Sequence, residues 1–462
     1  MSTFQTVSPI DNQTYCERPY ASDAECERVL NAARTQQRQW SATSLEERAQ
    51  RCEQVLQYFE QHQAAIADEI SWQMGRPRLQ ASGEINGLTE RARHMIAIAE
   101  QALTADKLTN MSGFRRYIAR EPLGTVLVLA PWNYPYLTAI NSIIPAIMAG
   151  NTVILKHSSQ TPLCAERFAA AFQHAAFPDN VFSYLHVNHA QTNQLIQHPN
   201  IDFVAFTGSV QGGIRVQQAA SQRFIPIALE LGGKDPAYVR EDADLDHAIS
   251  NLVDGAFYNS GQSCCGIERI YVHQHHFERF VDGFVDQVKQ YQLGDPRQDS
   301  STLGPVVSSR AAHAIQQQTQ QAIAQGATPL LETSHFDRPD IDTYVPPQVL
   351  INVDHSMAIM RDETFGPAVG IMAVQNDQAA LELINDSEFG LTASIWTQCE
   401  TEAIALGEQI HTGTVFMNRC DYLDPGLVWT GVKNSGRGYS LSTLGYHQLT
   451  RAKSFHLRLS TV

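Results

Sequence analysis

The sequence lacks the features of membrane-spanning and secreted proteins. Its longest apolar stretch, residues 137–150, is interrupted by Asn141 and Pro145 and is too short to cross a bilayer. The polar N-terminus has no charged segment followed by an apolar core, so we expect no signal peptide. The eight cysteines form no CxxC pair and follow no regular spacing, which is typical of free thiols in a reducing compartment. We therefore expect a cytoplasmic protein with no membrane partner.

Basic charge is also scarce. The chain has 33 Lys and Arg residues and 48 Asp and Glu residues, which give a net charge of −15. Since nucleic-acid phosphates need a basic surface, this balance argues against nucleic acid as a partner. The only metal-like cluster in the sequence, His273, His275 and His276, has no cysteine or carboxylate at ligand spacing, so we predict no metal. A chain of 462 residues with 43% hydrophobic residues is expected to form two or three globular domains.

The chain does contain a regular alternation of strands and helices. Residues 22–104 have a helical pattern, and apolar runs at 124–130, 152–156 and 201–206 are each followed by a further helix. This alternation predicts an α/β fold with a parallel, doubly wound sheet, and a second pattern of the same kind begins at residue 236. The helical layer that comes first is interpreted as a cover for the sheet.

Sheets of this kind bind ligands at the carboxyl ends of their strands, where Lys156 and Gly208 lie. The chain has no GxGxxG motif. Gly208, Ser209 and Gly213 nevertheless begin a predicted helix and could bring backbone N–H groups to a pyrophosphate. An ordinary tight turn and a solvated Lys156 are the alternatives that the pattern leaves open.

Cys264 and Glu230 are the candidate reactive groups. Cys264 follows a flexible Ser-Gly-Gln approach, although an unpaired cysteine more often fills core space. Glu230 ends an apolar stretch beside two glycines, where burial would raise its pKa and suit it to act as a general base near neutral pH. A Glu230 side chain that is paired to a lysine or a backbone amide is the structural alternative.

Seven short segments carry a family resemblance. They are PWNYP (131–135), AGNTVILKHSSQTP (149–162), FTGS (206–209), LELGGKD (229–235), GQSC (261–264), ETFGP (363–367) and VKNSGRG (432–438). In this order, and with 34 residues between Glu230 and Cys264, the chain resembles the aldehyde dehydrogenase superfamily over nearly its whole length. The resemblance implies a Rossmann-like cofactor domain, an α/β catalytic domain and a small β oligomerisation arm.

The resemblance also implies a mechanism. The Cys264 thiolate would attack the aldehyde carbonyl, and the Asn133 amide and the Cys264 backbone N–H would bind the oxyanion, at about 3 kcal/mol per donor. After hydride transfer, Glu230 would activate the water that hydrolyses the thioester. Because members that pass the acyl group to coenzyme A typically lack this glutamate, a free acid is favoured. A coenzyme A-acylating enzyme and a catalytically silent member are the alternatives.

NAD or NADP is the implied cofactor. In the family, Lys156 would reach the adenosine ribose and Glu363 would bind the hydroxyls of the nicotinamide ribose. Strictly NAD-dependent members usually carry glutamate at the position of Ser159, where a carboxylate would repel a 2′-phosphate, so we expect NADP to be accepted. The expected cofactor-binding residues are Pro131, Trp132, Lys156, Ser159, Gly208, Ser209, Gly213, Glu363 and Phe365.

The residues of the expected substrate tunnel differ from those of one group within the family. Those that oxidise succinic semialdehyde usually place arginines at the positions of Asn141 and Tyr258, so a carboxylate-bearing substrate would lose its charge-assisted anchors here. Arg419 is a candidate replacement, and a surface salt bridge is its alternative role. The aromatic residues instead predict a partly aromatic, uncharged tunnel. The expected tunnel residues are Tyr134, Thr138, Asn141, Tyr258, Arg419 and Trp429.

The domain boundaries follow from the same comparison. Residues 1–103 and 123–234 are predicted to form the NAD(P)-binding domain and residues 235–447 the catalytic domain. Residues 104–122 and 448–462 are predicted to form the oligomerisation arm, so a homodimer or homotetramer is expected. Its substrate would be a small-molecule aldehyde.

Overall fold

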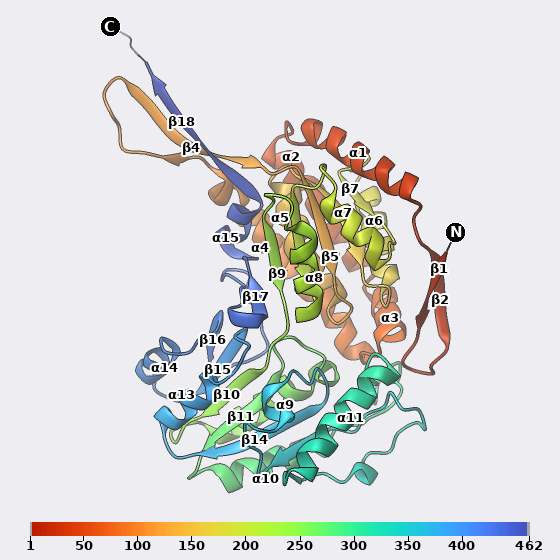
Figure 1. Cartoon of the computed structure of the whole chain (residues 1–462), viewed down its shortest axis with the longest axis vertical. Coiled ribbons are helices and arrows are strands. Elements are labelled where there is room, and N and C mark those ends of the chain that lie inside the picture. Colours follow the sequence, from red (N-terminus) through yellow and green to blue (C-terminus); the bar gives the residue numbers. More distant parts are fainter. Residues whose placement is uncertain (1, 460–462) are drawn as a thin grey trace.

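The computed structural model describes residues 2–459. Figure 1 shows two α/β bodies, one above the other, and a narrow arm that projects from the upper body. Within residues 2–459, no helix is both long and apolar enough to cross a membrane. Met1 of the predicted cofactor domain and residues 460–462 of the predicted arm lie outside the described residues.

The first body contains a six-stranded sheet with the strand order β17-β9-β8-β5-β6-β7. All neighbouring strands are parallel except β17, which runs antiparallel to β9. The strand order reverses between β5 and β8, and ligands of doubly wound sheets bind at such a switch point. The strands are β5 (Thr125–Ala130), β6 (Thr152–His157), β7 (Phe182–Tyr184), β8 (Phe203–Thr207), β9 (Ile227–Glu230) and β17 (Gly436–Arg437).

Helices cover both faces of this sheet (Figure 1). The predicted helix starts at Ser22 and Ser44 are confirmed, because their hydroxyl groups accept the N–H groups of Glu25 and Glu47 at 3.2 and 3.1 Å. The helices are α1 (Asp23–Trp40), α2 (Leu45–Gln61), α3 (Gln63–Met74), α4 (Arg78–Leu103), α5 (Pro135–Met148), α6 (Pro162–His174), α7 (His189–Gln197), α8 (Val210–Ala220) and α15 (Ser442–Gln448).

The second body contains a seven-stranded sheet with the order β12-β13-β14-β11-β10-β15-β16, in which only β12 is antiparallel to its neighbour. Its strands are β10 (Asp235–Val239), β11 (Ile267–His273), β12 (Thr328–Pro329), β13 (Gln348–Ile351), β14 (Ala368–Val374), β15 (Thr392–Trp396) and β16 (Thr414–Met417). The helices that follow β10 in the chain are α9 (Leu245–Phe257), α10 (Phe277–Val288), α11 (Ser309–Ala324), α12 (Ala358–Arg361), α13 (Asp377–Asn385) and α14 (Glu400–Gly407). Short 3₁₀ turns are η1 (Tyr258–Gly261), η2 (Thr333–His335) and η3 (Lys433–Ser435).

The arm is a three-stranded antiparallel sheet, β18-β4-β3, made of β3 (Asp106–Lys107), β4 (Phe114–Pro122) and β18 (Thr450–Arg458). The rings of Tyr117 and Phe455 stack across it at 4.5 Å. A separate hairpin, β1 (Thr3–Val7) and β2 (Thr14–Pro19), packs near the end of β6, where the Thr6 hydroxyl donates to the Ser159 carbonyl at 2.8 Å.

The chain returns to the first body before residue 447, where the predicted catalytic domain ends. Strand β17 pairs with β9, and α15 packs on α4, where the Tyr446 hydroxyl donates to the Met95 carbonyl at 2.7 Å. The sequence pattern could not reveal this return, because β17 contains only Gly436 and Arg437. We propose that the second domain ends before Gly436.

Candidate active site

The loop that carries Cys264 crosses from α9 to β11 through η1. Asn259, Ser260 and Gly261 all have positive φ, at 53°, 56° and 70°, so the chain turns sharply. A side chain at Gly261 would lie 2.3 Å from the Gly366 carbonyl, which restricts this position to glycine. The turn presents Cys264, which is half-buried, to the space between the two bodies.

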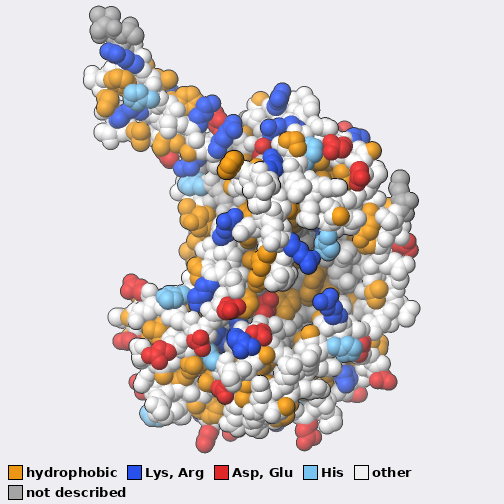
Figure 2. All heavy atoms as spheres, in the orientation of Figure 1, with side chains coloured by type: hydrophobic (Ala, Val, Ile, Leu, Met, Phe, Trp, Pro, Cys, Tyr) orange, Lys and Arg blue, Asp and Glu red, His pale blue; other side chains and the backbone are white. Residues whose placement is uncertain are grey.

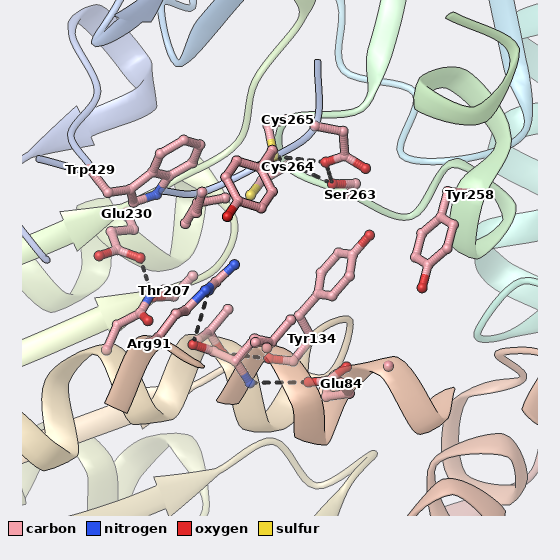
Figure 3. A pocket seen from close by; sticks show the side chains of 18 of the residues that line it. Glu84, Arg91, Tyr134, Thr207, Glu230, Tyr258, Ser263, Cys264, Cys265 and Trp429 are labelled. Atoms are coloured by element: carbon pink, nitrogen blue, oxygen red, sulfur yellow. Dashed lines mark hydrogen bonds between the residues drawn. The ribbon is translucent and has the colours of Figure 1, made fainter. Parts of the chain in front are cut away.

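That space is a cavity of about 270 Å³, and it brings Cys264 together with Glu230 (Figure 3). Cys264 reaches it from the second body, and Glu230 reaches it from the end of β9 in the first. The sequence-predicted residues that line the cavity are Tyr134, Thr138, Asn141, Tyr258 and Trp429. Arg419 does not line it, but its guanidinium lies over the ring of Tyr422, which does.

Asp421 holds the two residues on either side of Cys264. Its Oδ1 accepts the Ser263 hydroxyl and the Cys265 thiol, each at 2.9 Å. The Cys264 thiol, burial and the charge of Asp421 raise the pKa of Cys265 well above its usual value. Cys265 is therefore a neutral donor to Asp421.

Glu230 is suited to a role as base. Burial raises the pKa of its carboxyl, and hydrogen bonding and the positive charge of Arg91 oppose the shift. The Thr207 hydroxyl donates to its Oε2 at 3.2 Å. No ion pair to a lysine is present among residues 2–459, so the structural alternative of a lysine-paired glutamate does not apply.

Asn133 is buried, and its Nδ2 donates to the Gln262 carbonyl at 3.2 Å, two residues before Cys264. The side-chain amide has a second N–H, which this bond does not use. Arg76 donates to the Asn133 carbonyl and is also ion-paired to Glu84. This buried arginine was not predicted, because it lies in the helical layer that the sequence pattern left without a function.

Several of the predicted cofactor residues lie at the same interface between the two bodies. The rings of Trp132 and Phe365 meet edge to face across the two bodies, with 5.6 Å between the ring centroids. The Glu363 carboxylate accepts the Gly233 N–H at 3.0 Å, and burial and the charge of Glu268 raise its pKa to about 7. Glu268 itself accepts the N–H of Phe365 at 2.8 Å and so fixes the ETFGP loop.

Near the carboxyl end of β6, Lys156 has no ion pair among the described residues, and burial lowers its pKa to about 8. Ser209 caps α8 by accepting the Gly212 N–H at 3.2 Å, so the positive end of this helix points to the same edge. A side chain at Gly213 would meet Leu231 at 2.7 Å, so this glycine lets α8 pack closely there, and its part in cofactor binding stays a prediction. Ser159 is exposed, without a carboxylate in its place.

The predicted uncharged tunnel is wrong, because charged side chains from elements far apart in the sequence meet in the cavity. Helix α4 presents Gly83, Gly87 and Arg91, which are spaced four residues apart and share one face. That spacing is visible in the sequence, but only packing on α5 decides that this face lines a cavity. The charged residues that line it are Arg76, Glu84, Glu90, Arg91, Glu230, Asp254 and Asp421.

The histidine cluster has a carboxylate neighbour that the sequence spacing did not reveal. Ligand atoms of Glu241, His273 and His275 lie within 4.8 Å of one another. The predicted third histidine, His276, instead contacts the Glu241 carbonyl through its Nε2 at 2.7 Å. The structure describes no bound ion, and the prediction of no metal stays a prediction.

Comparison with known proteins gives one consistent family. A model described as "Aldehyde dehydrogenase family" matches residues 1–455. The NAD(P)+ succinate semialdehyde dehydrogenase Sad of Escherichia coli is 32% identical over 443 residues, which cover 96% of this chain and 95% of that protein. The Streptococcus pyogenes succinic semialdehyde dehydrogenase in complex with NADP+ has a TM-score of 0.94 at 27% identity, with coverage of 98% and 100%. The NADP-dependent glyceraldehyde-3-phosphate dehydrogenase of Bacillus halodurans, complexed with NADP, has a TM-score of 0.94 at 30% identity, with coverage of 99% and 96%.

This chain belongs to the aldehyde dehydrogenase family. The predictions of an α/β fold with a Rossmann-like cofactor domain and of NAD(P)-dependent aldehyde oxidation are confirmed. The roles of individual residues stay predictions.

The contacts of Asp421 generate a first prediction. Asp421→Ala removes the acceptor that holds both neighbours of Cys264, so the first-turnover burst of reduced cofactor should slow by about 10-fold or more, equivalent to about 1.4 kcal/mol. Asp421→Asn keeps the Oδ1 acceptor and should retain more of the rate. Asp424→Ala, in the same loop and exposed, is the control. Stopped-flow absorbance checks this, and an unchanged burst in Asp421→Ala would contradict it.

Proposed function

We propose that this chain oxidises a short aldehyde to the free carboxylic acid, with Cys264 as the nucleophile and Glu230 as the base. The observation that carries the proposal is that both side chains line one cavity. A thiol supplies the attacking sulfur, and a carboxylate whose pKa is raised by burial can take a proton from water near neutral pH.

In the first half of the reaction, the Cys264 sulfur forms a bond to the aldehyde carbon and gives a thiohemiacetal. The free N–H of the Asn133 amide and the Cys264 backbone N–H stabilise the negative oxygen. Asn133 is held for this task, because its carbonyl accepts from Arg76 and from Asn259, the latter at 3.3 Å. Bound NAD(P) would supply the hydride acceptor, so that loss of hydride from the thiohemiacetal would leave Cys264 as a thioester.

In the second half, Glu230 takes a proton from a water molecule while the oxygen of that water attacks the thioester carbon. The carbon–sulfur bond breaks, the acid leaves and Cys264 is regenerated. A carboxylate base next to the thioester lets water take the acyl group, so coenzyme A is not needed as the acceptor. The coenzyme A-acylating alternative is therefore less well supported. The silent alternative is disfavoured because the aldehyde dehydrogenase family is established and the reactive side chains persist.

The residues at the interface of the two bodies fit a dinucleotide. Lys156 is a half-buried cation without an anionic partner in the described chain, which suits a ribose or phosphate oxygen. The N-terminus of α8 suits a pyrophosphate, and the Glu363 carboxylate suits ribose hydroxyls. The relatives named above carry NAD(P)+ or NADP+ in their names, which supports acceptance of NADP here.

Two variants separate the proposed roles of the reactive side chains. Cys264→Ala should abolish formation of reduced cofactor, because no thiohemiacetal can form. Glu230→Gln should keep the burst but lower steady-state turnover by about 100-fold, within the 10²–10⁴ range of a general base. Since burial raises the pKa of Glu230 and its ionised form is the base, wild-type turnover should fall as the pH drops through that raised value. Rapid-mixing absorbance measures the burst of reduced cofactor, and steady-state absorbance measures the turnover and its dependence on pH. Unchanged turnover in Glu230→Gln would refute the base assignment.

Ser159 generates a separate prediction about the cofactor. Ser159→Glu places a carboxylate where it repels a 2′-phosphate, so kcat/KM for NADP should fall at least about 10-fold relative to NAD, a factor that corresponds to 1.4 kcal/mol. Ser158→Ala, the neighbouring change, is the control. A wild-type enzyme that turns over NADP a thousandfold more slowly than NAD would refute the proposal.

We also propose a cytoplasmic homodimer or homotetramer that assembles through the arm. All cysteines in the described chain are free, which suits a reducing compartment. The arm projects clear of the body and carries apolar side chains among basic ones (Figure 2). Its exposed large apolar residues include Leu108, Met111 and Leu457, at 46%, 45% and 41% exposure. Exposed apolar residues in one place favour a protein interface.

Charges on the arm should therefore break the assembly. The double variant Leu108→Glu and Leu457→Glu should lower the native mass, measured by light scattering during size-exclusion chromatography, because two carboxylates would be buried unpaired. Ile404→Glu, an exposed apolar residue on α14 in the second body, is the control and should leave the mass unchanged. A wild-type monomer would overturn the proposal.

A further inference from the structure

We propose that Arg91, together with the amide of Asn141, binds an anionic group at the far end of the aldehyde substrate. The substrate class is then a short aldehyde with a terminal carboxylate. This inference rests on the proposed function, because it assumes that the aldehyde end reacts at Cys264.

Arg91 is placed in the cavity by the packing of α4 on α5. Its Nη1 donates to the Leu137 carbonyl at 3.3 Å, and a side chain at Gly87, one turn earlier, would meet Leu137 at 2.8 Å. The two helices therefore approach closely at this point. Figure 3 shows the guanidinium group extending from α4 into the space below Glu230 and Cys264.

Arg91 has no ion pair among residues 2–459, in contrast to Arg76 in the same cavity, which is paired with Glu84. Burial lowers the pKa of Arg91, but a guanidinium remains charged at neutral pH. A charge removed from water without a partner is costly, and an anionic ligand would remove that cost. Arg91 thus lies near the carboxylates of Glu84, Glu90 and Glu230 but forms an ion pair with none of them within residues 2–459.

The carboxylates around the cavity have other partners or lie at its exposed edge. Glu84 is paired with Arg76 and accepts two backbone N–H groups at the start of α5. Asp421 accepts from the loop of Cys264, and Glu90, which is exposed, accepts the Tyr422 hydroxyl at 3.2 Å. Asp254 is exposed as well. Glu230 is close enough for the charge of Arg91 to lower its pKa. Burial has the larger effect and raises that pKa, and no ion pair joins the two residues within residues 2–459.

Asn141 adds an independent observation. It is only 3% exposed, it lines the cavity, and its Oδ1 has no hydrogen-bond partner among the described residues. It lies four residues after Leu137 on α5, so it is on the same helix face as the carbonyl that Arg91 contacts. Because the two ends of an amide can exchange places by rotation, the NH₂ group can face a carboxylate beside Arg91. A guanidinium and an amide then bind the two oxygens of one carboxylate.

The position of Asn141 also explains why the sequence predicted the opposite. Family members that oxidise succinic semialdehyde usually carry arginine there, and its absence argued against an acidic substrate. Arg91 supplies the same charge from the neighbouring helix, at a position that sequence spacing alone does not connect with Asn141. A cavity of about 270 Å³ fits a chain of a few carbon atoms between this anion site and Cys264.

The test compares succinic semialdehyde with butanal, which has the same number of carbon atoms and no carboxylate. The wild-type kcat/KM should favour succinic semialdehyde, and Arg91→Gln should lower that preference at least about 10-fold, mainly through KM, as for one charge-assisted hydrogen bond. Asn141→Ala should lower it by a smaller factor. Arg93→Gln, on the same helix but exposed and paired with Glu53 and Glu60, should leave the preference unchanged.

A binding measurement keeps this inference separate from the proposed function. Isothermal titration of succinic semialdehyde into the Cys264→Ala variant should give binding that the added Arg91→Gln change removes. If no aldehyde forms reduced cofactor with the wild type, the proposed function fails, and the titration still tests Arg91. The inference is overturned by an active Arg91→Gln enzyme with unchanged preference, by equal titration of both variants, or by a wild-type preference for 3-aminopropanal, which would assign the cavity to a cation.

Discussion

A buried ion pair between Arg76 and Glu84 connects the parts of this active site. Arg76 donates to the Asn133 carbonyl and to Asn259 Oδ1, the latter at 3.1 Å, so it joins the loop of the first body to the loop of the second. Glu84 accepts the first N–H groups of α5. Removing one partner of a buried pair costs about 3–5 kcal/mol, because the other charge is left unpaired. The relative position of the two bodies at the reactive centre depends on this pair.

Two further carboxylates hold loops of the proposed active site in the same way. Glu268 accepts the backbone N–H groups of the ETFGP loop and is paired with Lys234 at 2.5 Å. Asp421 accepts from both neighbours of Cys264. Each carboxylate binds the chain at a point where a loop ends or a helix begins, so the reactive side chains lie on backbone that has few alternative conformations. The site is therefore preorganised by groups that do not react.

The cavity is less simple than its aromatic residues suggest. Tyr134, Tyr258 and Trp429 give it apolar walls. On one side, Arg91 adds a guanidinium without an ion pair and Asn141 an amide oxygen without a hydrogen-bond partner among residues 2–459. Such a combination is common in sites for small ligands, where apolar walls exclude water and a few polar groups fix the orientation. In this chain, the polar groups come from α4 and α5, next to the residues that carry the chemistry.

The sequence by itself determined the family and the alternation of strands and helices, and it predicted the roles of Cys264, Glu230 and Asn133. These features are local, because a motif keeps its residues together and burial follows from apolar periodicity. Only the tertiary structure decided what surrounds the nucleophile. Asp421 approaches Cys264 from 157 residues further along the chain, a contact that no periodicity reports. Arg91 likewise became part of the cavity only because one face of α4 packs on α5, and that packing is a property of the folded chain.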